Sequence, residues 1–264
     1  MRIIVWNCHG AGSASEAWDY LLELDPEIAL LQEVRSLPAK IESRYDWRGH
    51  LATNKDGTSQ RFQTGILARR FGERIELRGP ESWVNKELER FAGNLVASEV
   101  LTSQGKPVNV ISVYSPAWPV SRERLDGVDT SHVKLTQNCD VWVGDLLWAS
   151  LVASEINKEQ NWIVGGDFNL SESFDLWCGG PRGNREYLDR MSEVGLVECL
   201  RTSTGILTPT FRNLRDGMMK HQMDHLFVTQ EFGALLSTCC TGSQERVFGL
   251  GLSDHLPIIA DFGE

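Results

Sequence analysis

The chain has 264 residues, and its 26 basic and 36 acidic side chains give a formal net charge of −10. With 41% hydrophobic and 23% charged residues, the composition is typical of a globular protein and excludes a collagen-like, coiled-coil or wholly disordered chain. No apolar run approaches the roughly 18 residues of a membrane-spanning helix, and the acidic balance argues against salt-driven binding of nucleic acid over a broad surface.

The cysteines and the chain's organisation also indicate its class. Six cysteines are scattered without a C-x-x-C pair, which favours reduced thiols over a disulfide framework or a zinc ribbon and predicts a cytoplasmic protein. The first apolar run is too short for a secretory signal. No repeat or Pro/Gly/Ser-rich linker divides the chain, so residues 1–264 are expected to form a single domain, and a monomer is expected.

The hydrophobic pattern predicts many strands and few helices. Residues 2–8 form an apolar, β-rich run, residues 15–24 carry apolar groups at helical spacing up to Asp25-Pro26, and residues 28–34 read as a buried strand. The polar stretch 116–139 is expected to be a long surface insertion. Further strands are expected near residues 64–69, 95–101, 108–114, 162–168, 223–229 and 257–262, and helices near 140–157 and 184–194. This order favours a two-sheet sandwich flanked by helices over a strict βαβ series.

Polar side chains collect where these expected strands begin or end. The first strand ends in Trp6-Asn7 and the second in Gln32-Glu33. Residues 165–169 read Gly-Gly-Asp-Phe-Asn, the strand 223–229 begins with Met-Asp-His, and Ser-Asp-His-Leu-Pro at 253–257 precedes the last apolar run. If these strand ends meet at one edge, they gather oxygen ligands for a hard cation and groups for proton transfer in one cleft.

Asp167 and Asn169 carry the strongest signal in this set. They lie two residues apart in an extended segment and therefore point to the same side. Purely structural interpretations stay open at other positions, because Asn7 suits a turn and Glu33 could be a solvated charge beside Arg35.

In two places an aspartate is followed directly by a histidine, at Asp224-His225 and at Asp254-His255. A buried carboxylate at Asp224 would want a partner, and His255 is a candidate. His225, which follows Asp224, is expected to have a packing or surface role. Asp254 and His255 before Leu-Pro-Ile-Ile are hard to explain as a turn alone.

Together these residues resemble the endonuclease/exonuclease/phosphatase superfamily, which includes DNase I-like nucleases. The resemblance runs from Ile3 to Phe262 with the motifs in the expected order, and Gly-Gly-Asp-Phe-Asn with Ser-Asp-His-Leu-Pro is a specific pair. It implies an α/β fold, namely a four-layer α/β sandwich with two central mixed β-sheets flanked by helices. It also implies hydrolysis of a phosphate ester with Mg²⁺ or Mn²⁺.

The resemblance assigns catalytic roles to five residues. Asp167 positions or deprotonates the attacking water, and Asn169 holds the phosphate or the nucleophile. His255 donates to a phosphate oxygen as charge builds, while Asp224 fixes the orientation of its ring. Tyr114, in Val-Tyr-Ser-Pro, matches the strand end that offers a hydroxyl to the phosphate.

The resemblance also implies a metal site and shows one departure. Glu33 would be the main metal ligand, with Asn7 close beside it and Asp254 at the metal site or supporting it. The chain has Ala-Trp-Pro at 117–119, where abasic-site endonucleases carry an asparagine soon after Tyr-x-Pro. Trp118 and Trp177, in or beside expected loops, are candidates for base stacking.

A metal-dependent phosphodiester hydrolase, acting on DNA as an endonuclease or exonuclease, is therefore the leading interpretation. A small-molecule or lipid phosphatase or phosphodiesterase of the same fold is an alternative that would need a substrate-specific loop. An inactive scaffold is a further alternative, disfavoured because all the acidic and histidine positions are present. A zinc site built from His221, His225 and His255 is disfavoured because Phe227 and Val228 indicate a strand where the His-x₃-His spacing would need a helix.

Overall fold

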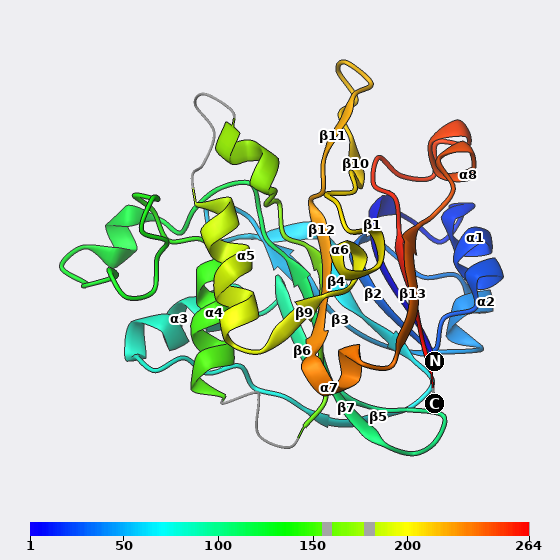
Figure 1. Ribbon diagram of the computed structural model, residues 1–264, viewed down its shortest axis with the longest axis horizontal. Helices are drawn as coiled ribbons and strands as arrows, with labels where there is room; N and C mark the ends of the chain where they lie inside the picture. The colour runs from blue at the N-terminus through cyan, green and yellow to red at the C-terminus, as the bar shows by residue number, and fades with distance from the viewer. Residues whose placement is uncertain (155–159, 177–182, 264) are drawn as a thin grey trace.

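The computed structural model describes residues 1–154, 160–176 and 183–263, and two six-stranded sheets lie at its centre (Figure 1). The first sheet has the order β13 (Leu236–Thr241), β14 (Ile258–Phe262), β1 (Arg2–Ala11), β2 (Ile28–Val34), β4 (Ser59–Ala68) and β3 (Asp46–Thr53). The second has the order β5 (Phe71–Arg74), β6 (Leu95–Leu101), β7 (Pro107–Tyr114), β8 (Trp162–Asp167), β12 (Asp224–Thr229) and β9 (Leu196–Glu198).

Helices cover the outer face of each sheet and complete four layers. Helices α1 (Ala17–Leu24), α2 (Ala39–Glu42) and α8 (Gln244–Gly249) pack on the first sheet, and α3 (Ser82–Arg90), α4 (Val143–Ala153) and α5 (Asn184–Glu193) pack on the second (Figure 1). Helix α6 (Cys199–Thr204) contributes to the core between the sheets, and α7 (Gln230–Gly233) follows β12. The four-layer α/β sandwich with two mixed sheets is confirmed.

Burial on both faces explains why β1 reads as a continuous apolar run. Ile3 and Val5 belong to the core between the two sheets, whereas Ile4 and Trp6 belong to the core beneath α1. A strand covered on both sides cannot alternate apolar and polar residues as a half-exposed strand does. The β1–β2 pair is parallel, and both strands end at the same edge of the sheet.

The space between the sheets changes from apolar to polar toward that edge. On β1 the inward-facing residues are Ile3, Val5 and then Asn7, which pairs in register with Gln32 of β2. In the second sheet Asp167 at the end of β8 pairs with Asp224 at the start of β12. The hydrophobic core therefore ends in a layer of buried polar side chains contributed by both sheets.

Most expected elements are present, with shifted ends. Strand β1 continues to Ala11 through an irregularity after Asn7, and β4 begins at Ser59 rather than near residue 64. The segment 116–139 is irregular apart from one 3₁₀ turn at Arg122–Leu125, as expected for an insertion. The expected helix 140–157 is α4, and residues 155–159 lie outside the described part. No helix of the described chain is long and apolar enough to cross a membrane.

The sequence pattern did not predict several edge strands and short helices. These are β3, β5, β9, β13, the β10 (Phe211–Arg212) and β11 (Met219–His221) hairpin, and helices α2, α3, α6, α7 and α8. Strands β3 and β13 lie at sheet edges and each buries a single residue, so their apolar alternation is weak. Helices α2, α6, α7 and α8 have four to six residues, too few turns to show a helical period. Helix α3 is longer, but it buries only three of its nine residues.

Candidate active site

Polar strand ends from both sheets meet at one edge of the sandwich. Asn7 joins them, because its amide nitrogen donates to Asp167 Oδ2 at 3.0 Å and to Glu33 Oε1 at 3.3 Å. Asn7 and Glu33 belong to the first sheet and Asp167 to the second. The strand ends that the sequence suggested as one cleft are therefore in contact across the two sheets.

The backbone after Asn7 fixes the orientation of its carboxamide. The amide N–H of His9 donates to Asn7 Oδ1 at 3.0 Å, so the nitrogen end faces the carboxylates. His9 has a left-handed backbone with φ of 48°, and Glu33 has φ of 55°, which are uncommon for residues other than glycine. Strained backbone of this kind is concentrated at functional sites in proteins.

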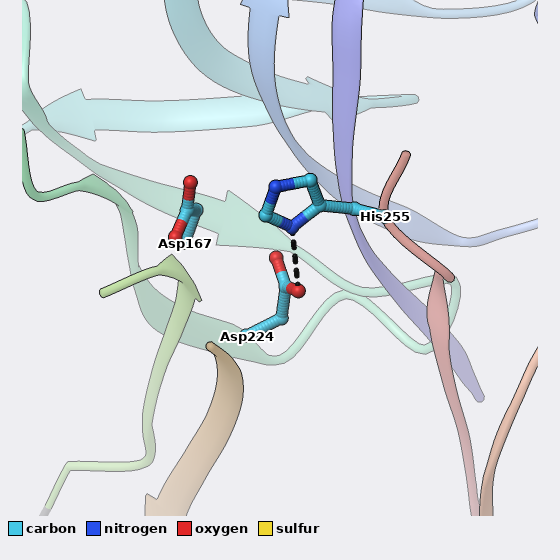
Figure 2. A group of neighbouring side chains, drawn as sticks. All are labelled: Asp167, Asp224 and His255. Atoms are coloured by element: carbon cyan, nitrogen blue, oxygen red, sulfur yellow. Dashed lines mark hydrogen bonds and ion pairs between the residues drawn. The ribbon is translucent and has the colours of Figure 1, made fainter. Parts of the chain in front are cut away.

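His255 and Asp224 form a buried hydrogen-bonded pair (Figure 2). Nδ1 of His255 lies 2.8 Å from Asp224 Oδ2, and both side chains are buried. Since a carboxylate only accepts, Nδ1 carries the proton and Nε2 is left for another partner. The backbone carbonyl of His255 accepts from Trp6 Nε1 at 2.9 Å, and its N–H donates to Ser253 Oγ at 3.0 Å.

The acids around His255 shift its protonation. Burial lowers the pKa of His255, but the neighbouring carboxylates of Asp224 and Asp167 outweigh burial and raise the pKa to about 10. The imidazole is thus an imidazolium at neutral pH and a strong hydrogen-bond donor. Burial, together with the charge of Asp224, raises the pKa of Asp167 above the usual aspartate range, with His255 acting in the opposite direction.

Asn169 lies directly beside Asp167. Its backbone N–H donates to Asp167 Oδ1 at 2.9 Å, and its side-chain nitrogen donates to the carbonyl of Ser115 at 2.7 Å. The expectation of an extended segment from Asp167 to Asn169 is wrong, because β8 ends at Asp167 and Asn169 has a left-handed backbone with φ of 47°. These contacts hold the end of β8 against the segment that follows β7.

Tyr114 ends β7 and pairs in register with Asp167. Burial raises the pKa of the Tyr114 hydroxyl well above its ordinary value, and the charges of Glu33 and Asp167 raise it further. The hydroxyl therefore remains protonated and can donate a hydrogen bond. The ring of Phe62 packs edge-on against the tyrosine at 5.3 Å between centroids.

Asp254 lies at the rim of this site. Its Oδ1 is 2.9 Å from Nδ1 of His9, and the histidine side chain is half exposed whereas that of Asp254 is largely covered. The charge of Asp254 also helps to raise the pKa of His255. All eight residues proposed from the sequence thus come from strand ends or loops on one edge of the sandwich.

The donor set fits a hard divalent cation. Glu33, Asp167, Asp224 and Asp254 place more negative charge here than the imidazolium of His255 balances, and Oδ1 of the buried Asp224 has no hydrogen-bond partner. Carboxylate oxygens are the preferred ligands of Mg²⁺ and Mn²⁺. Ligand atoms of Asp167, Asp224 and His255 lie within 4.8 Å of one another, although His255 already donates to Asp224.

Two histidines considered for a zinc site lie in strands and have other partners. Nε2 of His225 contacts the carbonyl of Leu170 at 3.1 Å, and its Nδ1 contacts Gln222 Nε2 at 3.2 Å. His221 lies in β11 and contacts Ser173. The helical turn that a His-x₃-His ligand pair requires is therefore not formed, and His225 instead holds the segment after Asn169.

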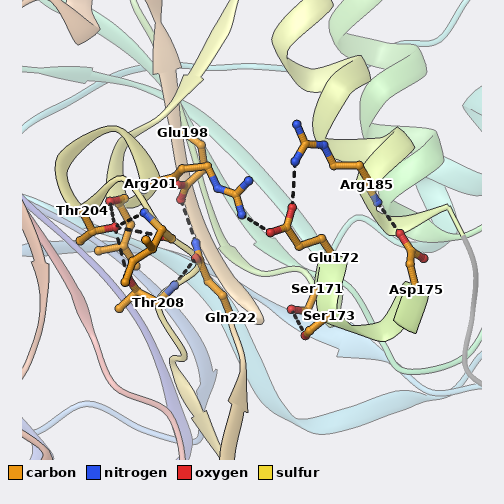
Figure 3. Close-up of polar contacts among 12 residues, drawn as sticks. Ser171, Glu172, Ser173, Asp175, Arg185, Glu198, Arg201, Thr204, Thr208 and Gln222 are labelled. Atoms are coloured by element: carbon orange, nitrogen blue, oxygen red, sulfur yellow. Dashed lines mark hydrogen bonds and ion pairs between the residues drawn. The ribbon is translucent and has the colours of Figure 1, made fainter. Parts of the chain in front are cut away.

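A network of charged residues holds the same segment from outside. Glu172 accepts from Arg201 at 2.5 Å and from Arg185 at 3.1 Å, and Glu198 accepts from Gln222 at 3.1 Å (Figure 3). Arg201 and Glu198 come from the β9–α6 junction, and Arg185 comes from α5. The 3₁₀ turn Glu172–Leu176 that follows β8 is thus tied through Glu172 to α5 and to the β9–α6 junction.

Sequence reasoning missed the residues that orient the site. The backbone carbonyl of Ser115 accepts a hydrogen bond from the side chain of Asn169. The hydroxyl of Ser253 donates to the carbonyl of Asn7 at 2.7 Å, and the ring of His9 contacts Asp254. Ser253 could have been found because it begins the Ser-Asp-His motif, but small polar residues in loops carry little signal by themselves. Trp118 is partly buried, and Trp177, the other stacking candidate, lies outside the described residues.

The sandwich fold and the acid–histidine site define a hydrolytic phosphoesterase. The chain belongs to the endonuclease/exonuclease/phosphatase family, whose model matches residues 4–255. Family membership and the acidic and histidine cluster support a divalent cation as the cofactor. A comparison with curated protein sequences found no match.

Several solved structures share the fold. The 3′ phosphatase NExo from Neisseria bound to a product DNA hairpin is 19% identical, with a TM-score of 0.70 and full coverage of both chains. The catalytic domain of Xenopus laevis APE2 is 17% identical, with a TM-score of 0.69 over 99% of this chain and 91% of that chain. An AP endonuclease from Archaeoglobus fulgidus is 15% identical, with a TM-score of 0.67 over 99% of both chains.

Proposed function

We propose that the protein is a Mg²⁺- or Mn²⁺-dependent phosphodiesterase that cleaves DNA. The observation that carries this proposal is the contact between strand ends of both sheets, where Asn7 links Glu33 to Asp167 beside the Asp224–His255 pair. A phosphodiester is anionic and repels an attacking hydroxide. The reaction therefore needs positive charge at the phosphate and a base for the water, and this site offers groups for both.

Each residue has a role that follows from its contacts. Imidazolium His255 donates from Nε2 to a phosphate oxygen, while Asp224 holds the ring by Nδ1. Asp167, with its raised pKa, accepts a proton from the attacking water. The protonated Tyr114 hydroxyl, in register with Asp167, donates to the phosphate. Asn169 holds the nucleophile site in place, because its N–H donates to Asp167 Oδ1.

Glu33 and Asp254 are the residues that would hold the cation, with Asn7 orienting the carboxylate of Glu33. When bound, a divalent cation neutralises phosphate charge and stabilises the departing oxyanion. These carboxylates suit this role because the imidazolium of His255 balances only part of the negative charge at the site.

The β10–β11 hairpin supports a nucleic-acid substrate. It projects from the sandwich at the same edge as the site (Figure 1), and its base pairs with His255 through Phe211. At its tip Leu214 and Met218 are 61% and 48% exposed, and Arg215 is also exposed. Proteins that bind a DNA groove typically place apolar side chains between bases and a basic side chain, such as that of arginine, against the phosphates. Structures that share the fold include the Neisseria 3′ phosphatase bound to a DNA hairpin.

A substrate panel tests the proposal. The protein is incubated with plasmid, linear duplex, abasic duplex, single-stranded DNA, RNA and a phosphoinositide, each with Mg²⁺, with Mn²⁺ and with EDTA. We expect metal-dependent cleavage of DNA that EDTA abolishes and that the His255→Gln variant lacks. Cleavage of the phosphoinositide alone, or no cleavage of any phosphodiester by the folded protein, would overturn the proposal.

We also propose a cytoplasmic location and a monomeric state. The cysteines of the described residues are free, and two of them, Cys139 and Cys240, are exposed. Exposed thiols are kept reduced in the cytoplasm, whereas oxidising compartments favour disulfides.

A further inference from the structure

Thr210 lies between the two segments that carry the Asp224–His255 pair. It follows Pro209 and precedes β10, and its side chain is fully buried. On one side it borders residues 221–224, which lead into β12, and on the other it borders residues 254–256. The two partners of the buried pair are 31 residues apart in sequence, so their alignment depends on a segment that contacts both.

The hydroxyl of Thr210 holds the start of β12. Its Oγ1 accepts from the backbone N–H of Met223 and from that of Asp224, both at 3.1 Å. These two N–H groups lie at the first ladder pair between β12 and β8, Asp224 with Asp167, and at the residue before it. Because Thr210 and Asp224 are 0% exposed, bulk water cannot replace the hydroxyl if it is removed.

The backbone around Thr210 holds the other partner. Its carbonyl accepts from the N–H of Leu256 at 2.7 Å, and the N–H of Arg212 donates to the carbonyl of Asp254 at 2.8 Å. Between these bonds, Phe211 forms a bridge with His255, and the two rings lie 4.9 Å apart. Residues 210–212 therefore bracket His255 on both sides of its backbone.

We propose that Thr210 is a positioning residue that keeps Asp224 aligned with His255 through its hydroxyl group. This inference rests on the proposed function, since it assigns a catalytic purpose to the pair. The contacts of the Thr210 hydroxyl are with the backbone N–H groups of Met223 and Asp224, so its role is indirect. Removing its hydroxyl leaves two buried N–H groups without an acceptor, and the start of β12 must shift to satisfy them. A shift of the Asp224 backbone changes the 2.8 Å contact that orients the His255 ring.

Thr210→Val tests this inference because valine keeps the shape and removes the acceptor, while Thr210→Ser keeps the hydroxyl. Thr229→Val is the matched control, since Thr229 Oγ1 accepts from the N–H of Trp162 at 3.3 Å at the opposite end of β12. Steady-state kinetics on a DNA duplex and on bis-p-nitrophenyl phosphate, with thermal unfolding of each variant, separate activity from stability.

We expect Thr210→Val to lower kcat about tenfold or more on both substrates, with KM changed less than about twofold, because misalignment affects the reaction rather than binding. Thr210→Ser and Thr229→Val should keep kcat within about twofold of the parent protein. Equal kcat losses in Thr210→Val and Thr229→Val, no loss in Thr210→Val, or equal losses in Thr210→Val and Thr210→Ser would each overturn the inference.

A spectroscopic measurement decides the same question without activity. The proton on His255 Nδ1 should give a downfield resonance in ¹⁵N-labelled protein, assigned by its absence in His255→Gln. Thr210→Val should shift or broaden this resonance, and Thr229→Val should leave it in place. An inactive parent protein would overturn the proposed function alone, and the resonance would still test the alignment. If both Thr210→Val and Thr210→Ala fail to fold, the residue serves global stability and the inference is wrong.

Discussion

Asn7 determines how carboxylates from two separate sheets can share one site. Its amide nitrogen contacts both Glu33 and Asp167, and its oxygen is occupied by the N–H of His9. A side chain with two donors and one acceptor suits this position, because neither a carboxylate nor an apolar group could satisfy both acids. The N–H of His9 reaches the Asn7 oxygen from a left-handed backbone conformation, which is strained for a residue other than glycine.

Asp167→Asn should abolish turnover while the fold persists. The amide keeps the shape of the side chain but cannot accept a proton from water, so hydrolysis of bis-p-nitrophenyl phosphate should fall by about 100-fold or more. Burial disfavours the charged form of Asp167 and, with the charge of Asp224, outweighs the attraction to His255, so a neutral amide should not decrease the free energy of unfolding. Urea unfolding and the rate with Mg²⁺ measure the two effects, and near-parental activity of the variant would contradict the role of Asp167.

Asp145 provides a pH test outside the site. Burial raises the pKa of this α4 carboxyl to about 7, although the N–H of Trp142 donates to it at 2.8 Å. The folded state then binds a proton more tightly than the unfolded state, so the free energy of unfolding should fall as pH rises from about 4 to about 7. The amide of Asp145→Asn does not titrate, so this fall in the free energy of unfolding should disappear. Its oxygen can still accept from the N–H of Trp142, so that hydrogen bond is kept.

At pH 8 the Asp145→Asn variant should be more stable than the parent protein by about 1–3 kcal/mol, and the difference should vanish near pH 4. Urea unfolding at both pH values measures it. Asp126→Asn, at an exposed position, is the control for the change of net charge. A difference that is equal at pH 4 and pH 8 would mean that the proton on Asp145 is not responsible.

At the scale of single residues, the sequence indicated those that end apolar strands. Asp167, Asn169 and Glu33 stand out because a polar side chain follows a buried run. The alternation of a strand fixes the face of Asp167 alone, since Asn169 lies beyond the end of β8 and both Asn169 and Glu33 have a left-handed backbone. Thr210 and Ser115 gave no such signal. Their contacts are with groups of distant segments, which only the folded chain brings to them.

At the scale of elements, the β10–β11 hairpin combines two tasks. Its base pairs with the segment that carries His255, and its tip exposes Leu214, Arg215 and Met218. The pattern of the sequence did not predict it, because two strands of two and three residues carry almost no periodic signal. The longer elements, such as β7 and α5, were predicted within a residue or two because their apolar spacing extends over several turns or pairs.

Replacing Leu214 and Met218 together by serine should raise KM for a DNA duplex about tenfold, because the tip would lose its apolar contact with the bases. Hydrolysis of bis-p-nitrophenyl phosphate, which is too small to reach the tip, should not change. Leu235→Ser is the control, since this exposed leucine follows α7 and lies outside the hairpin. Equal effects on both substrates would indicate a disturbed site rather than a lost substrate contact.

At the scale of the whole molecule, the family resemblance predicted what periodicity could not. The strand pattern favoured a two-sheet sandwich, but the pairing order and the four layers follow from contacts between distant segments, such as β1 between β2 and β14. Motifs at strand ends indicated the site because the sandwich places those ends at one edge. The site in turn brings like charges from both sheets together, which opposes their packing in the absence of a counterion.

A divalent cation should therefore stabilise the whole sandwich and not only the site. A ligand that binds only the folded state at about 100 times its Kd adds about 2.7 kcal/mol, which for a chain of this size corresponds to a rise in Tm of about 5–10 °C. We expect this rise with Mg²⁺ or Mn²⁺ and its reversal by EDTA, measured by calorimetry. Glu33→Gln should remove most of the rise, whereas Glu231→Gln, at an exposed position on α7, should keep it. An equal rise in both variants would place the cation away from Glu33.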